Sequence, residues 1–380
     1  MKSIFLNSIT DISAQDWNSV VKSDYPFMRH EFLAAMELSQ SACTKSGWTP
    51  QHLVVSNDDE LIAVMPLYLK DHSYGEYIFD WSWAGAYERY GLDYYPKLLS
   101  AIPFTPATGS RLAYLDSVDQ QQIYSYISQI LQAHAVEIEA SSIHILLPDK
   151  QETSEWAKQG LATRTTSQFH WFNDGYQNFD DFLEKFSSRK RKNLKKERRR
   201  ISEQGISMRV LTGSEITSEL WDVFYDFYQL TYAKRSGHGG YLKRGFFDLL
   251  SESMSEQVML VLAEYEGRYV AGALYFYSSS TLYGRYWGCT HEFEMLHFEA
   301  CYYQGIEFCI AKGLDKFDAG AQGEHKIQRG FTPIPIWSNH WIKDKQFSDA
   351  VNDFIVKEAE GNLAYIENAK DYLPFKKESE

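Results

Sequence analysis

Cysteine is scarce in this sequence. The 380 residues include four cysteines, none of them in a CxxC pair: Cys43, Cys289, Cys301 and Cys309. Sparse usage in a long chain is typical of reduced thiols in the cytosol, whereas small secreted proteins carry dense cysteine frameworks. We therefore expect a cytoplasmic protein without disulfide bonds.

Long hydrophobic runs are also lacking. A typical apolar stretch, 143–147, is interrupted by His144 and is far shorter than the ~20 residues that a membrane-spanning helix requires. The N-terminal segment has no continuous apolar core, because Asn7, Asp11 and Asp16 interrupt it, so no secretion signal is expected. The sequence predicts no membrane-spanning segment, and any contact with a membrane would be peripheral.

Several catalytic motifs are absent. The sequence has no GxSxG, no phosphate-binding P-loop, no HExxH zinc motif and no dinucleotide fingerprint after a predicted strand. The 11 histidines are dispersed. These absences disfavour hydrolases, nucleoside triphosphatases and dehydrogenases of the common types, and we expect no bound metal and no required cofactor.

The composition is that of a folded globular protein with an excess of aromatic residues. Apolar residues make up 44% of the chain and charged residues 23%. At about 150 residues per domain, the length predicts two domains, with three as the alternative. Aromatic residues reach 16%, which is more than a core requires and favours a groove with aromatic walls.

An internal duplication explains most of the pattern along the chain. Two stretches, which begin at His52 and Met259, both read as strand, tight turn, strand, strand, and identical residues recur between them at a shift of 207, such as Leu53 with Leu260. A helix with a similar apolar pattern precedes each stretch. Further along, His170 and His340 follow glycines at a shift of 170. The change of shift places about 37 extra residues in the first copy, at 84–122. A chance similarity between hairpin patterns is the alternative interpretation.

After each hairpin the chain alternates between helix and strand. The expected elements are 121–138, 142–147, 151–159 and 163–172 in the first copy, and 296–311, 314–318, 324–329 and 334–342 in the second. This order predicts an α/β (α+β) protein of two tandem units, each a mixed, mostly antiparallel sheet flanked by helices. We expect a first domain at 1–175, a second at 176–345 and a helical tail at 346–380.

The net charge is −13, yet positive charge is concentrated in one segment. Nine of the twelve residues in 189–200 are basic and only Glu197 is acidic. Apolar residues at helical spacing predict one long helix from about residue 179, or two helices broken at Ser187-Ser188. A solvated helix is one interpretation; the other is a phosphate-binding surface for RNA, a phosphorylated substrate or an anionic membrane. The candidate phosphate-binding residues are Arg189, Lys190, Arg191, Lys195, Arg198 and Arg199.

Polar and ionisable residues are densest in 317–333, between two predicted strands of the second copy. Glycines here allow close backbone approach, and the candidate catalytic residues are Asp318, Glu324, His325 and Lys326. Transfer of an acyl group to an amine needs a base for the amine proton and donors for the oxyanion. Asp318, Glu324 or His325 would be the base, and Lys326, Arg329 or backbone N–H groups the donors. Structural roles, as a helix cap or in surface ion pairs, are the alternative.

Two further clusters predict the walls of a substrate cleft. The first copy contributes an aromatic and charged set, Asp80, Trp81, Tyr87, Glu88 and Arg111. In the second copy Arg285, Tyr286 and Trp287 end a predicted strand, and His297, Glu299, Tyr303 and Gln304 begin the next predicted helix. The first set would read a sugar or a peptide. His297 and Glu299 do not have the i, i+4 spacing of a helical metal pair.

The segments GAQGEHKIQRGF, PLYLKDHSYGEYIFDW and RYWGCTHEFEMLHFEACYYQGIEFCI together resemble a bacterial family of predicted N-acyltransferases related to FemAB-type peptidoglycan enzymes. The resemblance covers nearly the whole chain. It implies two tandem GNAT-type domains and transfer of an acyl or aminoacyl group to an amine acceptor such as a cell-wall precursor. The donor would be aminoacyl-tRNA, which suits the basic helix, or acyl-CoA, although the usual CoA-binding loop has no good match here.

Two other classes of function remain as alternatives. A protein without chemistry that binds RNA or an anionic surface would depend on the basic segment alone. A non-catalytic scaffold would bind its ligand tightly and turn over no donor.

Overall fold

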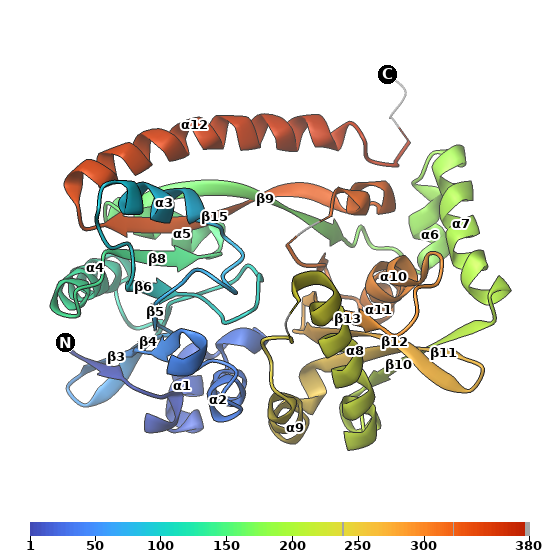
Figure 1. Ribbon diagram of the computed structural model, residues 1–380, viewed down its shortest axis with the longest axis horizontal. Helices are drawn as coiled ribbons and strands as arrows, with labels where there is room; N and C mark the ends of the chain where they lie inside the picture. The colour runs from blue at the N-terminus through green and yellow to red at the C-terminus, as the bar shows by residue number, and fades with distance from the viewer. Residues whose placement is uncertain (238, 322, 377–380) are drawn as a thin grey trace. The chain divides into compact units, whose positions relative to one another are not determined.

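The computed structural model describes residues 1–237, 239–321 and 323–376 (Figure 1). Their contacts form two compact units. The first unit comprises Met1–Ser167 and Pro335–Tyr365, and the second comprises Gln168–Ile334 with the residues from Ile366 onward. The chain therefore leaves the first unit within one strand and returns to it within another. The domain boundaries predicted after residues 175 and 345 stay predictions.

The first unit contains two sheets. One is antiparallel in the order β1 (Lys2–Leu6), β3 (His52–Asn57), β4 (Glu60–Met65) and β7 (Ala113–Tyr114). Asp58 and Asp59 join β3 to β4 with φ of 47° and 68°, which is the left-handed geometry of a tight hairpin turn. The other sheet has the order β15 (Thr332–Ile342), β8 (Ser142–Leu146), β6 (Lys97–Ser100), β5 (Tyr68–Lys70) and β2 (Trp48–Pro50). Strands β6 and β8 are parallel, and the other neighbouring pairs of this order are antiparallel.

Helices cover these sheets with their apolar faces. The helices of the first unit are α1 (Ala14–Val21), α2 (His30–Leu38), α3 (Trp81–Arg89), α4 (Gln120–Glu137) and α5 (Lys150–Lys158). In α4, Ile123, Ile127 and Leu131 recur every four residues and are buried against the strands, so the amphipathic pattern in the sequence decides which face turns inward. Asp119 and Asp149 cap the N-termini of α4 and α5 by accepting backbone N–H groups.

The third strand predicted in the stretch from His52 is present as β5, but it does not extend the β3–β4 hairpin. Strand β4 ends at Met65 because Pro66, which has no N–H, cannot continue the ladder. The chain then forms β5, which pairs with β2 and β6 and not with β4, and residues 81–89 form α3. The predicted insertion at 84–122 contributes β6, whose Leu98 and Leu99 are fully buried, so it is part of the core.

The second unit contains one mixed sheet. Its order is β10 (Ile206–Thr212), β11 (Val258–Tyr265), β12 (Arg268–Tyr277), β13 (Thr281–Cys289), β14 (Lys316–Asp318) and β9 (Ala162–Phe172). Among the strands described in this unit, β13 and β14 are the one parallel pair, and β11, β12 and β13 form the predicted antiparallel meander. The predicted class of mixed, mostly antiparallel sheets flanked by helices is confirmed.

The helices of the second unit include the predicted basic segment. They are α6 (Phe179–Glu184), α7 (Ser188–Glu203), α8 (Ser218–Ser236), α9 (Arg244–Ser253), α10 (Leu296–Phe298) and α11 (Gln304–Lys312). The basic segment forms two helices, α6 and α7, which are separated near Ser187. This agrees with the second of the two predicted forms. Residues 299–303 form a π-helical turn, η6 (Glu299–Tyr303), and residues 324–329 form a 3₁₀ helix, η7 (Glu324–Arg329).

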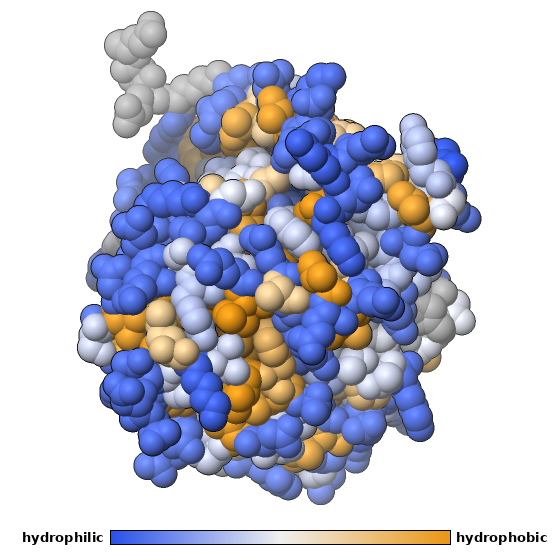
Figure 2. Space-filling view, turned by 90° about the vertical axis from the view of Figure 1, so that its left-hand side faces the viewer, coloured by the Kyte–Doolittle hydropathy of each residue, from blue (hydrophilic) through white to orange (hydrophobic). Residues whose placement is uncertain are grey.

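The helical tail predicted at 346–380 is α12 (Lys345–Lys370), followed by a short segment; residues 377–380 lie outside the described residues. Val351 and Ile355 of α12 pack with Trp83 and Tyr87 of α3 inside the first unit. Among the described residues, no helix combines the length and the apolar composition needed to cross a bilayer. The face shown in Figure 2 is mostly hydrophilic, with smaller apolar areas between the polar ones.

Two glycine substitutions test how tightly the second unit is packed. A Cβ at Gly288 of β13 would lie 2.0 Å from the carbonyl oxygen of Phe227 in α8, whereas a Cβ at Gly361 of α12 would meet nothing within 4 Å. We expect Gly288→Ala to lower the free energy of unfolding by about 1–3 kcal/mol and Gly361→Ala to raise it by about 0.5–1 kcal/mol. Urea unfolding of both variants measures this, and an unchanged Gly288→Ala would contradict the close approach of α8 to β13.

Candidate active site

The polar loop of the second unit begins where β14 ends. Asp318 is the last residue of β14, and the chain then turns through Gly320 and Gly323, whose φ angles of 85° and 114° strongly favour glycine. The 3₁₀ helix η7 follows and ends at Gly330. Glu324 and His325 are exposed, whereas Lys326 and Arg329 are buried. The structure therefore divides the predicted catalytic residues between the surface and the interior.

Beneath the loop lies a buried cluster of charged side chains. A carboxylate oxygen of Asp318 accepts the N–H of Gly320 at 2.9 Å, and its other oxygen lies 3.3 Å from the guanidinium of Arg285. His170 of β9 lies 3.8 Å from the same carboxylate. Lys326 donates to the carbonyl oxygen of Gly320 at 2.7 Å. Together these contacts connect β9, β13, β14 and η7.

Burial shifts the protonation of this cluster. Desolvation lowers the pKa of Lys326 to about 7, with Asp318 opposing the shift, and lowers the pKa of His170 to about 4. Burial by itself would raise the pKa of Asp318, but Arg285 and His170 outweigh it and hold this pKa below its ordinary value. Near neutral pH the cluster thus contains an ionised carboxylate, a neutral histidine and a lysine close to its midpoint.

His325 is the exposed group with the geometry of a general base. Its Nε2 lies 2.7 Å from the hydroxyl of Tyr302, which is buried in η6, and its ring lies against Gly323, where a Cβ would approach to 2.5 Å. Partial burial, and then the charges of Arg329 and Lys326, lower the pKa of His325. The imidazole is therefore neutral at pH 7, with one nitrogen fixed by a hydrogen bond, as proton abstraction requires.

Other predicted residues of the second copy are used within the protein. Arg329 donates to Tyr303, to Glu197 and to the carbonyl oxygen of His325. Glu299 is buried and accepts from Arg198 and from Gln304. Tyr286 is buried against Tyr228, and the ring of Trp287 lies edge-on to His297, 5.4 Å away. Of this set, His297 and Trp287 lie in the same aromatic group as His325.

The basic helix α7 has two different faces. Arg198 is half-buried and donates to both Glu299 and Glu307, so its predicted role in phosphate binding is at odds with its contacts. Lys190 donates to Gln328, and Lys195 pairs with Asp180. The outward face carries an exposed cationic stripe, defined as Arg189, Lys192, Lys196 and Arg199. Spacings of three, four and three residues place these side chains on one side of the helix, over about 15 Å.

The predicted site residues of the first copy are also divided between the interior and the surface. Arg111 is fully buried and donates to the carbonyl oxygens of Ala107, Gly109 and Leu146, which makes it a structural residue. Asp80 is buried beside Lys97, and Tyr87 is packed against Phe347 at 4.0 Å between ring centroids. Trp81 and Glu88 line a surface pocket.

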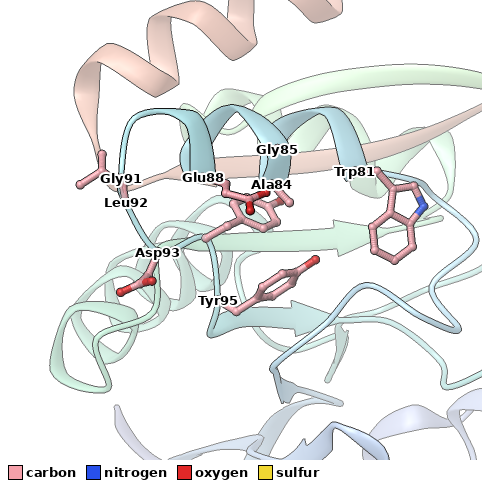
Figure 3. A pocket seen from close by; sticks show the side chains of 9 residues that line it. Trp81, Ala84, Gly85, Glu88, Gly91, Leu92, Asp93 and Tyr95 are labelled. Atoms are coloured by element: carbon pink, nitrogen blue, oxygen red, sulfur yellow. The ribbon is translucent and has the colours of Figure 1, made fainter.

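This pocket has a volume of ≈ 680 Å³ and lies along α3 and the segment leading to β6. Figure 3 shows the rings of Trp81 and Tyr95 on the same side of α3, with Glu88 and Asp93 nearer its C-terminal end. Flat aromatic faces beside carboxylates suit a ligand with sugar hydroxyls or ammonium groups. The volume is within the range of small-molecule sites.

Comparison with known proteins shows to which family the chain belongs. A family model described as FemAB-like, peptidoglycan biosynthesis/recognition, matches residues 8–377. The protein belongs to the FemAB-like family. The search of curated proteins found no significant match.

Solved structures similar to this FemAB-like protein share its fold at low sequence identity. The crystal structure of FemX is 13% identical, with a TM-score of 0.57 over 93% of this chain and 100% of that chain. The C-terminal domain of a putative lysylphosphatidylglycerol synthetase from Agrobacterium fabrum is 9% identical, with a TM-score of 0.56 over 92% and 98%. L-PGS from Bacillus licheniformis is 10% identical, with a TM-score of 0.51 over 88% and 97%. At these identities the likeness concerns the fold.

The sequence interpretation missed a second buried charged network, in the first unit. Lys97 is fully buried and donates to Ser73, to Glu76 at 2.8 Å and to Asp80. Burial raises the pKa of Glu76 to about 7, although Lys97 opposes this shift. At Asp80 burial also raises the pKa, but the charge of Lys97 and other contacts outweigh it and lower the pKa to about 2. The acids Glu76 and Asp80 lie four residues apart, but nothing in the sequence linked them to Lys97.

The same network extends to two histidines from distant parts of the chain. Tyr94 donates to Asp80 at 2.6 Å and lies 3.3 Å from His144, whose Nδ1 lies 2.6 Å from Nδ1 of His340. Burial lowers the pKa of His144 to about 3 and that of His340 well below its ordinary value, so both rings are neutral. His144 and His340 lie opposite each other on the paired strands β8 and β15. The sequence did not reveal which residues of these two strands would pair.

The low pKa of Lys326 predicts a pH-dependent contribution to stability. Between pH 7 and 10.5 the unfolded chain binds this proton and the folded chain does not, so the free energy of unfolding rises with pH, by up to about 1.4 kcal/mol per pH unit. In Lys326→Met this part of the slope disappears, whereas the exposed Lys312→Met keeps it. Urea unfolding between pH 7 and 9.5 measures the slopes, and equal slopes for both variants would contradict a neutral Lys326.

Proposed function

We propose that this FemAB-like protein is an N-acyltransferase that moves an aminoacyl or acyl group onto an amine of a peptidoglycan precursor, with His325 as the general base. The observation that carries the proposal is the exposed, neutral imidazole of His325, which Tyr302 orients above a buried charged cluster. Membership of a family described for peptidoglycan biosynthesis supplies the class of acceptor.

The chemistry follows from this arrangement. The acceptor amine attacks the carbonyl carbon of the donor, so that a C–N bond forms and a negative charge develops on the carbonyl oxygen. His325 takes the proton that the amine loses. The C–O or C–S bond to the donor then breaks, and the leaving group is protonated. Asp318 and Lys326 would support this step indirectly, because they hold the loop from below.

We infer that the donor is polyanionic and favour aminoacyl-tRNA. The cationic stripe of α7 belongs to the same unit as His325, and within the described part of the chain the side chains of Arg189, Lys192 and Lys196 form no ion pair. Acyl-CoA, which also carries phosphates, is the other candidate donor. The pocket of the first unit, with its aromatic faces and carboxylates, is a separate candidate place for a ligand with sugar or peptide groups.

Replacement of the proposed base tests the reaction. We expect His325→Gln to lower kcat/KM by about 10²–10⁴-fold, because general base catalysis contributes this much, and Tyr302→Phe to have a smaller effect. In the wild type, activity is retained above the pKa of His325 and lost as the pH falls through it, at a pH below 6.5. The exposed His291 is the control, and His291→Gln is expected to be fully active.

The assay uses aminoacyl-tRNA or acyl-CoA with a peptidoglycan precursor. Full activity of His325→Gln would contradict its role as base. No turnover with either donor by the wild type, together with tight RNA binding, would favour the non-catalytic RNA-binding alternative.

Neutralising the cationic stripe tests the donor. The fourfold variant Arg189→Gln, Lys192→Gln, Lys196→Gln and Arg199→Gln is expected to bind bulk tRNA more weakly, with a shallower dependence on salt, by about 0.7–0.9 in log–log slope for each lost phosphate contact. The control replaces four exposed lysines of the first unit, Lys22, Lys45, Lys150 and Lys158, by glutamine. Equal losses in both variants would show that net charge alone governs binding.

A further inference from the structure

The one acidic residue of the basic segment, Glu197, faces inward. Its two carboxylate oxygens accept from Nη2 of Arg329 at 2.9 and 3.0 Å, and the hydroxyl of Tyr303 donates to it as well. Arg329 is buried, so its charge needs a partner close by. Glu197 supplies that partner from a helix whose neighbouring side chains are cationic.

Arg329 also contacts the loop that carries His325, and so connects this loop to Glu197. Its Nη1 donates to the carbonyl oxygen of His325 at 2.7 Å, its Nε donates to Tyr303 at 3.0 Å, and its guanidinium lies 3.4 Å from the ring centroid of Phe298. Every nitrogen of the guanidinium is thus fixed by the protein. The planar fork of arginine makes these contacts in one geometry, which lysine cannot reproduce.

Two more contacts fix α7 against the same region of the second unit. Lys190, two turns before Glu197, donates to Gln328 of η7. Arg198 donates to Glu299 in the π-helical turn and to Glu307 in α11, and its guanidinium lies 4.5 Å from the ring of Phe179. The inward face of α7 is therefore anchored to η6 and η7, whereas its cationic stripe is left for an anionic ligand.

We propose that Glu197 and Arg329 are positioning residues, which connect the anion-binding helix α7 to the backbone of His325 and set the place and the electrostatic environment of its ring. The effect of these residues on catalysis rests on the proposed function, in which His325 is the general base. The connection itself can be measured without any substrate.

The electrostatic consequence has a definite sign. The charged and titratable groups around the ring are Arg329 and Lys326 from its own segment, Tyr302 from η6 and His297 from α10. The positive charge of Arg329 lowers the pKa of His325, and the carboxylate of Glu197 partly cancels that charge. Removal of the carboxylate leaves Arg329 uncompensated, so the pKa of His325 falls further.

The experiment compares two carboxylates of the same helix. Glu197→Gln removes the charge next to Arg329, and Glu203→Gln removes an equal charge that pairs with Arg199 and Arg200 at the end of the helix. NMR titration of the His325 ring, assigned from the spectrum of His325→Gln, is expected to show a lower pKa in Glu197→Gln and an unchanged pKa in Glu203→Gln. Glu197→Asp should bring the pKa back toward that of the wild type.

A second variant separates charge from geometry. Arg329→Lys keeps the positive charge but loses the fork, so the His325 pKa should stay near that of the wild type while kcat falls by about ten- to a hundredfold from displacement of the base. Bulk tRNA should bind to Glu197→Gln about as tightly as to the wild type, because Glu197 pairs inward with Arg329, whereas Glu203→Gln releases Arg199 of the stripe and should bind at least as tightly. This result would show that the effect of Glu197 is on the base and not on the anion-binding face.

Different results overturn different claims. A His325 pKa that is the same in Glu197→Gln, Glu203→Gln and the wild type would refute the coupling, whatever the activity. A shifted pKa in Glu197→Gln together with full activity of His325→Gln would leave the coupling intact and refute the role of His325 as the base. If Glu197→Gln does not fold, Arg329→Gln decides the point: loss of the positive charge should raise the pKa of His325, and an unchanged pKa would refute the coupling.

Discussion

Buried charge that needs a distant partner is the constraint on which much of this structure depends. Arg329 is buried and paired with Glu197 from α7, more than a hundred residues earlier, and Lys97 is buried and paired with Glu76 and Asp80. An unpaired charge at such depth costs several kcal/mol, so each pair requires that its elements come together correctly. Hydrophobic burial forms the cores, but these pairs determine which loop lies against which helix.

This constraint gives the two faces of α7 different tasks. A helix with nine basic residues in its central twelve positions would repel itself if all of them were left unpaired. The structure pairs Arg198 and Lys195 with carboxylates and leaves the cationic stripe exposed. The inward face of α7 thus holds the helix against the second unit, and its outward face remains positive. A helix solvated on all sides would have no such contacts to hold it in place.

The elements that the sequence predicted well are those with local signals. Helix α4, the β3–β4 hairpin and the meander β11–β12–β13 follow from apolar periodicity and turn residues, and the break at Ser187-Ser188 was one of two expected forms. The third strand of the first copy does not pair with the second, because Pro66 ends the β4 ladder and the chain continues as β5 in the other sheet. Aromatic residues such as Trp83 fit either a strand or a buried helix, and their tertiary contacts decide between the two.

The sequence suggested where the candidate site lies, which stays a prediction, but not the geometry of its residues. The density of polar residues at 317–333 identified the loop, since glycines and ionisable side chains seldom gather without a structural or chemical reason. Which of them face outward could not be inferred, because that depends on partners remote in sequence: Tyr302 for His325, Glu197 for Arg329 and Arg285 for Asp318. The network around Lys97 was missed for the same reason.

The two copies have diverged in where they place buried charge. At the shift of 170, Lys326 corresponds to Trp156 and Asp318 to Pro148. Trp156 is fully buried in the apolar core of the first unit, where Glu152 accepts its indole N–H at 3.0 Å. The first unit instead carries its charge around Lys97, on a strand from the segment that the second copy lacks. With an apolar side chain in place of Lys326, the described part of the first copy has a packed indole at the position where the second copy has its buried lysine.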